Sequence, residues 1–230
     1  MTTLVLLPGM DGTGELFRPL LQALEPGLPV LVISYPTTEL LDYAGLEAIV
    51  RDALPVGPYV LLGESFSGPI AISIASTNPE HLNGLVLCCS FASSPRAWAT
   101  ALAPALSLPL PLPPSFAIAA ALLGRFSSAR LRSMLRQSLT KVAVRVLRHR
   151  LAAALRVDVT PTLSQIKVPV LYIQASADWL VSSAAAAEVL SLLPSTAVKR
   201  VRGPHLLLQV NPTESAIAIH TFLAGVANAA

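Results

Sequence analysis

The chain of 230 residues lacks several features that would assign it to a class at once. It has no apolar run near the roughly 20 residues that cross a bilayer. Its first residues do not combine a basic segment with a long apolar one, so we expect no secretory signal peptide and a cytoplasmic protein. Only 13% of the residues are charged and 5% are aromatic, whereas 53% are hydrophobic. This composition predicts a single domain with a large aliphatic core.

Cysteine is also scarce, and the only two cysteines, Cys88 and Cys89, are adjacent in an apolar stretch. Neighbouring side chains of a strand point to opposite faces, which does not suit a disulfide between them. We therefore expect two buried thiols.

Acidic residues are absent between His81 and Val157. A basic segment of this kind can meet a membrane surface, nucleic acid or an anionic substrate, or it can be a solvated helix face that pairs with acids elsewhere. Aromatic residues are few and no recognition motif occurs, which disfavours nucleic-acid binding. Peripheral membrane contact stays open. The basic residues of the segment are Arg96, Arg125, Arg130, Arg132, Arg136, Lys141, Arg145, Arg148, Arg150 and Arg156.

Short apolar segments alternate with helical ones along most of the chain, which predicts a parallel sheet in an α/β fold. The apolar segments are rich in Val and Leu on both faces, as strands covered by helices on both sides should be. The predicted strands are Leu4–Leu7, Val30–Ser34, Tyr59–Leu62, Leu85–Cys89, Val170–Gln174 and Ala197–Val201. The predicted helices are Glu15–Leu24, Asp42–Leu54, Gly68–Thr77, Ser182–Leu193 and Pro212–Ala224.

The alternation fails between residues 90 and 168. Within this segment Leu131, Leu135 and Leu139 recur at helical spacing, with arginines on the opposite face. We predict that residues 1–89 and 169–230 form the core of the fold. Residues 90–168 are predicted to be a helical lid inserted between two adjacent strands.

Ser65 lies in the most informative segment, Tyr59-Val-Leu-Leu-Gly-Glu-Ser-Phe-Ser-Gly68. Its apolar start predicts a buried strand, and the small residues around the serine predict a tight turn into a helix. This is the geometry of a nucleophile elbow, where a hydroxyl is exposed to substrate in front of a helix N-terminus. Ser67 occupies the position where the G-x-S-x-G pattern has its second glycine, so the motif departs there.

A serine nucleophile needs a base and an acid that orients the base. His205 follows the last predicted strand, and Asp178 lies four residues beyond the strand before it. The order Ser, Asp, His and the placement at the carboxyl ends of strands both fit an open α/β sheet. Taken singly, each residue has a structural explanation, such as a turn, a helix start or a surface position. Their joint occurrence predicts a catalytic triad.

Two backbone N–H groups are needed to hold an oxyanion. We predict that Phe66 supplies one and that Met10, in the loop Pro8-Gly-Met-Asp-Gly-Thr-Gly14, supplies the other. This loop is not G-x-G-x-x-G and has no Walker lysine, so we expect no nucleotide to bind there. We also expect neither a cofactor nor a metal. The substrate pocket is predicted from the neighbours of the catalytic residues in the sequence, namely Trp179, Leu180 and Leu206.

These motifs together resemble the α/β-hydrolase superfamily over nearly the whole chain. The glycine-rich loop and Gly-Glu-Ser-Phe look like a bacterial esterase group. They are also similar to the hydrolase-like domain of plant phytyl ester synthases, which are acyltransferases. The resemblance implies Ser65 as nucleophile, His205 as base, Asp178 as orienting acid and an acyl-enzyme intermediate. It is carried by Leu7–Gly14, Gly63–Gly68, Val168–Asp178 and Gly203–His205.

The sequence therefore predicts a serine carboxylesterase acting on small-molecule esters with short- to medium-chain acyl groups. An acyltransferase, a lipase or a thioesterase using the same site on lipid substrates is the alternative, because the outcome depends on whether water or an alcohol reaches the acyl-enzyme. A non-catalytic binding protein with this fold would be expected to have an eroded triad. The complete set of residues argues against it.

Overall fold

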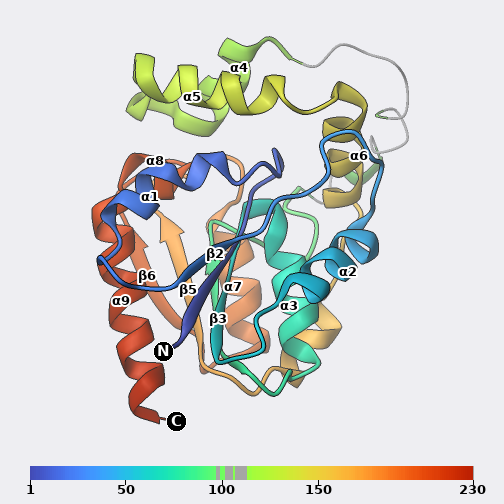
Figure 1. Ribbon diagram of the computed structural model, residues 1–230. Helices are drawn as coiled ribbons and strands as arrows, with labels where there is room; N and C mark the ends of the chain where they lie inside the picture. Colours follow the sequence, from blue (N-terminus) through green and yellow to red (C-terminus); the bar gives the residue numbers. More distant parts are fainter. Residues whose placement is uncertain (97–98, 102–105, 107–112, 230) are drawn as a thin grey trace.

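The computed structural model describes residues 1–96, 99–101, 106 and 113–229 (Figure 1). It confirms the α/β-hydrolase fold: six strands form a sheet in the order β2-β1-β3-β4-β5-β6, and all neighbouring strands are parallel. The strands lie within a few residues of their predicted bounds. They are β1 (Thr3–Leu7), β2 (Val30–Val32), β3 (Tyr59–Glu64), β4 (Leu82–Cys88), β5 (Val170–Ala175) and β6 (Ala197–Val201).

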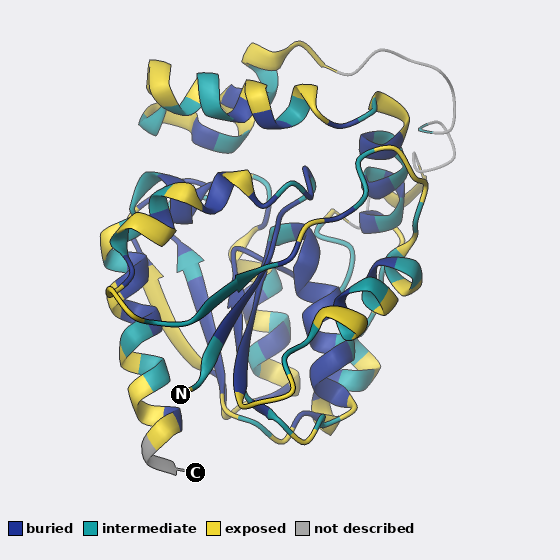
Figure 2. Cartoon of the chain, in the orientation of Figure 1, coloured by how far each residue is buried: buried dark blue, intermediate teal, exposed yellow. Residues whose placement is uncertain are grey.

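Helices cover both faces of the sheet (Figure 1). The period of two along β1 divides its side chains between two cores, because Leu4 and Leu6 pack on one face while Val5 and Leu7 pack on the other. Figure 2 shows the central strands buried and the outward helix faces exposed. The first face carries α1 (Arg18–Ala23), α8 (Leu207–Val210) and α9 (Pro212–Ala229). The second carries α2 (Tyr43–Ala53), α3 (Gly68–Ser76) and α7 (Ser183–Leu192).

The prediction that every strand is apolar on both faces is wrong for β6. Its first four residues are exposed, and only Val201 is buried. This strand is the outer one at its edge of the sheet, so its charged residues reach solvent. Arg200 there donates from Nε to Gln174 Oε1 on β5, at 2.9 Å.

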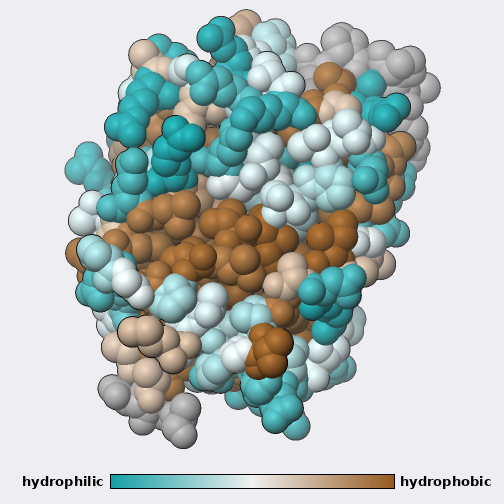
Figure 3. All heavy atoms as spheres, viewed as in Figure 1, coloured by the Kyte–Doolittle hydropathy of each residue, from teal (hydrophilic) through white to brown (hydrophobic). Residues whose placement is uncertain are grey.

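Strand β2 forms the opposite edge of the sheet, and all three of its residues are only partly buried. Hydrophobic side chains gather in a band over this part of the visible face in Figure 3. Leu21 and Leu40, on the adjoining segments, are among the exposed large hydrophobic residues. The aliphatic composition thus leaves apolar surface at this edge as well as filling the core.

In the described part of the segment between β4 and β5, three α-helices stand above the carboxyl ends of the strands in Figure 1. We call these helices, α4 (Ser115–Leu123), α5 (Ala129–Thr140) and α6 (Val144–Ala154), the cap. Leu135 is buried, and Leu131 and Leu139 are packed around it, as their spacing predicts. The predicted lid, residues 90–168, includes residues 97–98, 102–105 and 107–112, which lie outside the described part, so its boundaries stay a prediction.

Among the described residues, no helix combines the length and the apolar character that spanning a membrane requires. Cys88 and Cys89 are both buried and both free, which agrees with the expectation of two thiols.

Candidate active site

Ser65 follows β3 directly and has a left-handed backbone, with φ of 50°. Such a conformation costs a non-glycine residue on the order of 1–3 kcal/mol and persists only when its surroundings hold it. The carbonyl oxygen of Ser65 accepts a hydrogen bond from Ser90 Oγ at 2.6 Å, which fixes the turn from the end of β4. The structure therefore contains the sharp elbow that the sequence predicts.

The elbow requires glycine at two positions. A Cβ on Gly63 would lie 2.8 Å from the Ser67 carbonyl oxygen, and one on Gly68 would lie 1.7 Å from Ser90 Oγ. Both distances are far below van der Waals contact. Gly63 therefore allows β3 and α3 to approach each other, and Gly68 allows α3 to approach the segment after β4. Position 67 is free to carry a side chain.

Ser67 uses that freedom to join the elbow to the loop after β1. Its hydroxyl is completely buried, donates to the Pro8 carbonyl and is 2.7 Å from the Tyr35 hydroxyl. Burial raises the pKa of Tyr35, so the phenol stays protonated and donates to Ser67. At the position where the usual motif has glycine, Ser67 thus makes hydrogen bonds that join the elbow to the loops after β1 and β2.

Replacing Ser67 with alanine is expected to lower the free energy of unfolding by about 1–3 kcal/mol, because the Pro8 carbonyl and the Tyr35 hydroxyl lose a buried partner. Urea denaturation measures the change. Tyr35→Phe is the matched control, and the double variant should cost less than the sum of the two single variants. Strict additivity would contradict the hydrogen bond between the two side chains.

The three predicted catalytic side chains form one hydrogen-bonded chain. Ser65 Oγ is 2.7 Å from His205 Nε2, and His205 Nδ1 is 2.8 Å from Asp178 Oδ2. The side chains of His205 and Asp178 are only 4% and 5% exposed. With Nδ1–H donating to the carboxylate, Nε2 is left to accept the proton of the serine hydroxyl.

Asp178 is fixed by the backbone that follows it. Its second oxygen, Oδ1, accepts from the N–H groups of Leu180 and Val181, each at 2.9 Å. Both carboxylate oxygens are therefore engaged, one with the imidazole and one with the turn after β5. These hydrogen bonds fix the orientation of the carboxylate toward His205.

His205 is carried by the short turn after β6. Gly203 leaves room for this turn, since a Cβ there would lie 2.5 Å from Leu207 Cδ1. The next residue, Leu206, donates from its backbone N–H to the Leu122 carbonyl of α4 at 3.2 Å. The loop that presents the base is thus held by the cap as well as by the sheet.

Met10 lies in the loop that follows β1, as predicted for an oxyanion donor. Its N–H takes part in no hydrogen bond within the described residues, so it is available to a ligand. The loop is a tight turn in which the Gly12 N–H donates to the Gly9 carbonyl at 3.0 Å. Phe66, the other predicted donor, begins the turn into α3 beside the nucleophile.

Arg150 on α6 holds the loop that carries Met10. The side chain is 1% exposed, and Nη1 donates to the carbonyls of Met10 at 2.9 Å and Asp11 at 3.0 Å. Nη2 donates to the Pro36 carbonyl at 2.8 Å. A Cβ on Gly12 would lie 2.4 Å from Nη1, and Gly12 has φ of 71°, so the loop leaves room for the guanidinium only with glycine there. The prediction of a solvated arginine face is therefore wrong for Arg150.

Asp11 adds a second link between the cap and the same loop. Its Oδ2 accepts from the Thr13 hydroxyl at 2.6 Å and from Ser138 Oγ of α5 at 2.7 Å. The cap helices α5 and α6 thus both bind the segment that carries Met10.

Glu64, directly before the nucleophile, is buried with its carboxyl group close to Gly9. Its Oε1 accepts from Gln209 Nε2 at 2.9 Å, while Gln209 Oε1 is buried without a partner in the described structure. Burial is the main cause that raises the pKa of Glu64 to about 7, and the nearby Asp11 charge adds to it. A rotated Gln209 amide would accept the proton of the neutral acid.

This raised pKa predicts how stability depends on pH. Between about 4.5, the value of a free glutamate, and about 7, the folded protein binds a proton that the unfolded chain releases. The free energy of unfolding should therefore fall as pH rises through this window, by on the order of 3 kcal/mol, and level off above it. Glu64→Gln should lack this fall. Urea denaturation of both proteins at pH 5 and pH 8 tests it, and equal pH dependence would contradict the assignment.

The predicted pocket residues have separate surroundings. Trp179 is 73% exposed, and its carbonyl accepts from Arg96. Leu180 contributes its backbone N–H to Asp178, and Leu206 packs in a buried cluster with Leu135 and other cap residues. Their role in substrate binding stays a prediction.

Tyr43 is a site residue that the sequence did not single out. Its ring stacks on Phe66 with centroids 4.8 Å apart, and its hydroxyl donates to the Phe66 carbonyl at 3.1 Å. It starts α2, far from the elbow in sequence, so no local pattern indicates the contact. Arg150 is likewise indistinguishable in sequence from its exposed neighbours.

A six-stranded parallel sheet with a serine elbow, a histidine after the last strand and an acid after the strand before it defines an α/β-hydrolase. The family model described as serine aminopeptidase, S33 (Hydrolase_4), matches residues 38–207. The chain belongs to this hydrolase family.

Solved structures agree on the fold. An enol-lactonase from Burkholderia xenovorans LB400 is 17% identical with a TM-score of 0.80, covering 97% of this chain and 91% of that one. A lipase-esterase related protein from Clostridium acetobutylicum ATCC 824 is 18% identical with a TM-score of 0.80, covering 96% and 94%.

A local sequence match also exists to phytyl ester synthase 1, a chloroplastic protein of Arabidopsis thaliana. The two are 36% identical over 83 residues, which is 33% of this chain and 12% of that protein. The chain therefore matches only a small part of the length of this relative.

Proposed function

We propose that this hydrolase is a serine carboxylesterase that forms an acyl-enzyme on Ser65. The observation that carries the proposal is the continuous chain from Ser65 Oγ through His205 to the buried Asp178 carboxylate. A partly buried serine in a strained elbow, paired with an oriented base, is the arrangement that activates a hydroxyl for attack on an acyl carbon.

The reaction follows from these positions. Ser65 Oγ attacks the ester carbonyl while His205 Nε2 takes its proton, and the carbonyl oxygen becomes an oxyanion facing the Met10 and Phe66 N–H groups. The tetrahedral species collapses as His205 gives its proton to the leaving alcohol. Water then attacks the acyl-enzyme with His205 again as base, and the carboxylic acid leaves as Ser65 regains its proton.

The aliphatic residues of the cap favour substrates whose acyl chains are of short to medium length. Its inner side places aliphatic residues such as Leu123 and Leu135 in a cluster that reaches Leu206, next to the catalytic histidine. Two of the structural relatives are described as a lactonase and as lipase-esterase related, which fits ester substrates.

A panel of p-nitrophenyl esters with graded acyl length tests the proposal, with an alanine p-nitroanilide included because of the family's peptidase name. We expect ester cleavage with a maximum at short or medium length, and far slower amide cleavage because the amine is the poorer leaving group. Activity on the anilide alone would overturn the ester assignment.

Acyl transfer is the second candidate, because of the match to phytyl ester synthase 1 and because the cap exposes arginines that can meet an anionic membrane. Running the same panel with a long-chain alcohol distinguishes the two reactions. Transfer yields the new ester in place of free acid, and salt-sensitive sedimentation with anionic liposomes would support membrane contact.

A further inference from the structure

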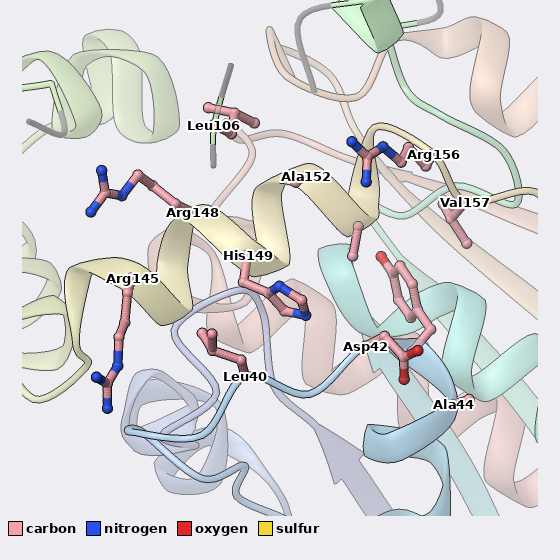
Figure 4. A pocket seen from close by; sticks show the side chains of 12 residues that line it. Leu40, Asp42, Ala44, Leu106, Arg145, Arg148, His149, Ala152, Arg156 and Val157 are labelled. Atoms are coloured by element: carbon pink, nitrogen blue, oxygen red, sulfur yellow. The ribbon is translucent and has the colours of Figure 1, made fainter. Parts of the chain in front are cut away.

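A pocket of about 590 Å³ lies between the start of α2 and the helix α6 of the cap (Figure 4). It is lined by neither Ser65 nor His205 nor Asp178. One wall consists of the loop before α2 and its first residues, and the other is one face of α6. Its volume is in the range of sites that hold small organic ligands.

The wall formed by α6 is strongly basic. Arg145, Arg148 and His149 line the pocket from α6, and their spacings of three and four residues place them on one side of the helix. Arg156 lines the pocket from just beyond the end of α6. Among the described residues that line the pocket, Asp42 is the one carboxylate, and its Oδ1 already accepts from the Gly45 N–H at 2.9 Å. The pocket therefore has an excess of positive charge, beside apolar side chains such as Leu40.

Several hydrogen-bond donors in this pocket are not used up by the protein. Arg145 donates from Nη2 to the Thr38 carbonyl at 3.1 Å, which occupies one of its five N–H groups. Arg156 makes no side-chain hydrogen bond or ion pair within the described residues. His149 Nε2 is buried and without a partner in the same part of the chain. Buried polar atoms are rarely left unpaired, so a polar partner is expected there, and a phosphate with one protonated oxygen can either accept from this nitrogen or donate to it.

Tyr43 connects the pocket to the catalytic elbow. It lines the pocket, while its ring stacks on Phe66 and its hydroxyl binds the Phe66 carbonyl. Phe66 directly follows the nucleophile. In Figure 4 the side chains of Arg145 and His149 extend from α6 toward the loop that carries Leu40. The pocket thus begins one aromatic side chain away from the residue next to Ser65.

We propose that this pocket recognises a phosphate group carried by the ester substrate. Planar guanidinium groups suit bidentate binding of phosphate oxygens. An ester with an uncharged alcohol part would leave the positive charge of the pocket without a counter-charge. The proposal rests on the esterase function and specifies its substrate class: acyl esters whose alcohol part bears a phosphate.

The test compares two esters that differ only in the phosphate, 1-hexanoylglycerol and 1-hexanoylglycerol 3-phosphate. The intact protein should cleave the phosphorylated ester with about 10- to 100-fold higher kcat/KM at low salt. This preference should fall toward one in the double variant R145Q/R156Q and at high salt. Arg130→Gln is the matched control, since Arg130 is exposed on α5 and lines neither this pocket nor the triad.

Binding to the Ser65→Ala protein separates this proposal from the esterase proposal. Calorimetric titration should show the phosphorylated ester binding at least about tenfold more tightly than the neutral one, and R145Q/R156Q in the same background should abolish the difference. Such binding without any ester cleavage by the intact protein would refute the esterase and keep the phosphate pocket. Equal kcat/KM for the two esters, or inorganic phosphate binding as tightly as the phosphorylated ester, would overturn the pocket as a substrate site.

Discussion

Replacing Ser65 with alanine should lower kcat for ester cleavage by at least about 10⁴-fold, the largest effect expected for any substitution in this chain. The loss follows from the geometry, because Ser65 Oγ is the only nucleophile placed at 2.7 Å from His205 Nε2 among the described residues. Without it the oxyanion donors can still bind the ester, but no acyl-enzyme forms. Steady-state kinetics on a p-nitrophenyl ester measures the change.

The same variant should keep its fold, since alanine can occupy the left-handed position at a cost similar to that of serine. Thermal melting checks this. A fluorophosphonate probe should add its mass to the native protein at Ser65 and leave the alanine variant unlabelled. Ser73→Ala on α3 is the matched control and should retain activity. Undiminished cleavage by the Ser65 variant would exclude the acyl-enzyme mechanism.

Replacing Arg150 with methionine is expected to have the second-largest effect. The guanidinium donates to three carbonyls in two loops, and its loss would leave buried acceptors unpaired and destabilise the protein by several kcal/mol. It would also release the loop that presents the Met10 N–H. Because removal of one oxyanion donor costs about 10²–10³ in kcat, partial displacement should cost about 10- to 100-fold.

Kinetics separates this positioning role from simple loss of stability. Below the melting temperature of the variant, kcat and the rate of fluorophosphonate labelling should both fall, while KM changes little. Arg150→Lys keeps the charge but has no planar fork, so it should restore stability more than kcat. Arg130→Met, at an exposed site on α5, is the matched control. An Arg150→Met protein with normal kcat and a lowered melting temperature would show that the contact is structural only.

The six strands and the triad could be predicted because they depend on local signals. Residues that follow the carboxyl ends of parallel strands lie at the same edge of the sheet, independently of how the helices pack. This holds for the serine of Gly-Glu-Ser-Phe and for the acid and the histidine just beyond two other strands. The glycines of the elbow were predictable for the same reason. The position of β6 at the edge of the sheet could not be predicted, because the order of the strands in the sheet decides which strand is exposed to solvent.

The residues that the sequence missed all act across long separations. Arg150 shares its composition and periodicity with exposed arginines, and only the placement of α6 against the loops after β1 and β2 distinguishes it. Tyr43 reaches Phe66 because α2 packs beside α3. The basic pocket needs α2 and α6 together, so neither segment alone indicates it.

The fit of Arg150 into the space that Gly12 leaves has a consequence for how this family could diversify. A side chain at position 12 would collide with the guanidinium, and a cap without the arginine would leave the carbonyls of the loop bare. Neither position can change alone, so the two should vary together among relatives. A cap segment transplanted from another hydrolase would therefore fail unless it brought its own arginine or a matching loop, and cap and core would be inherited as one module.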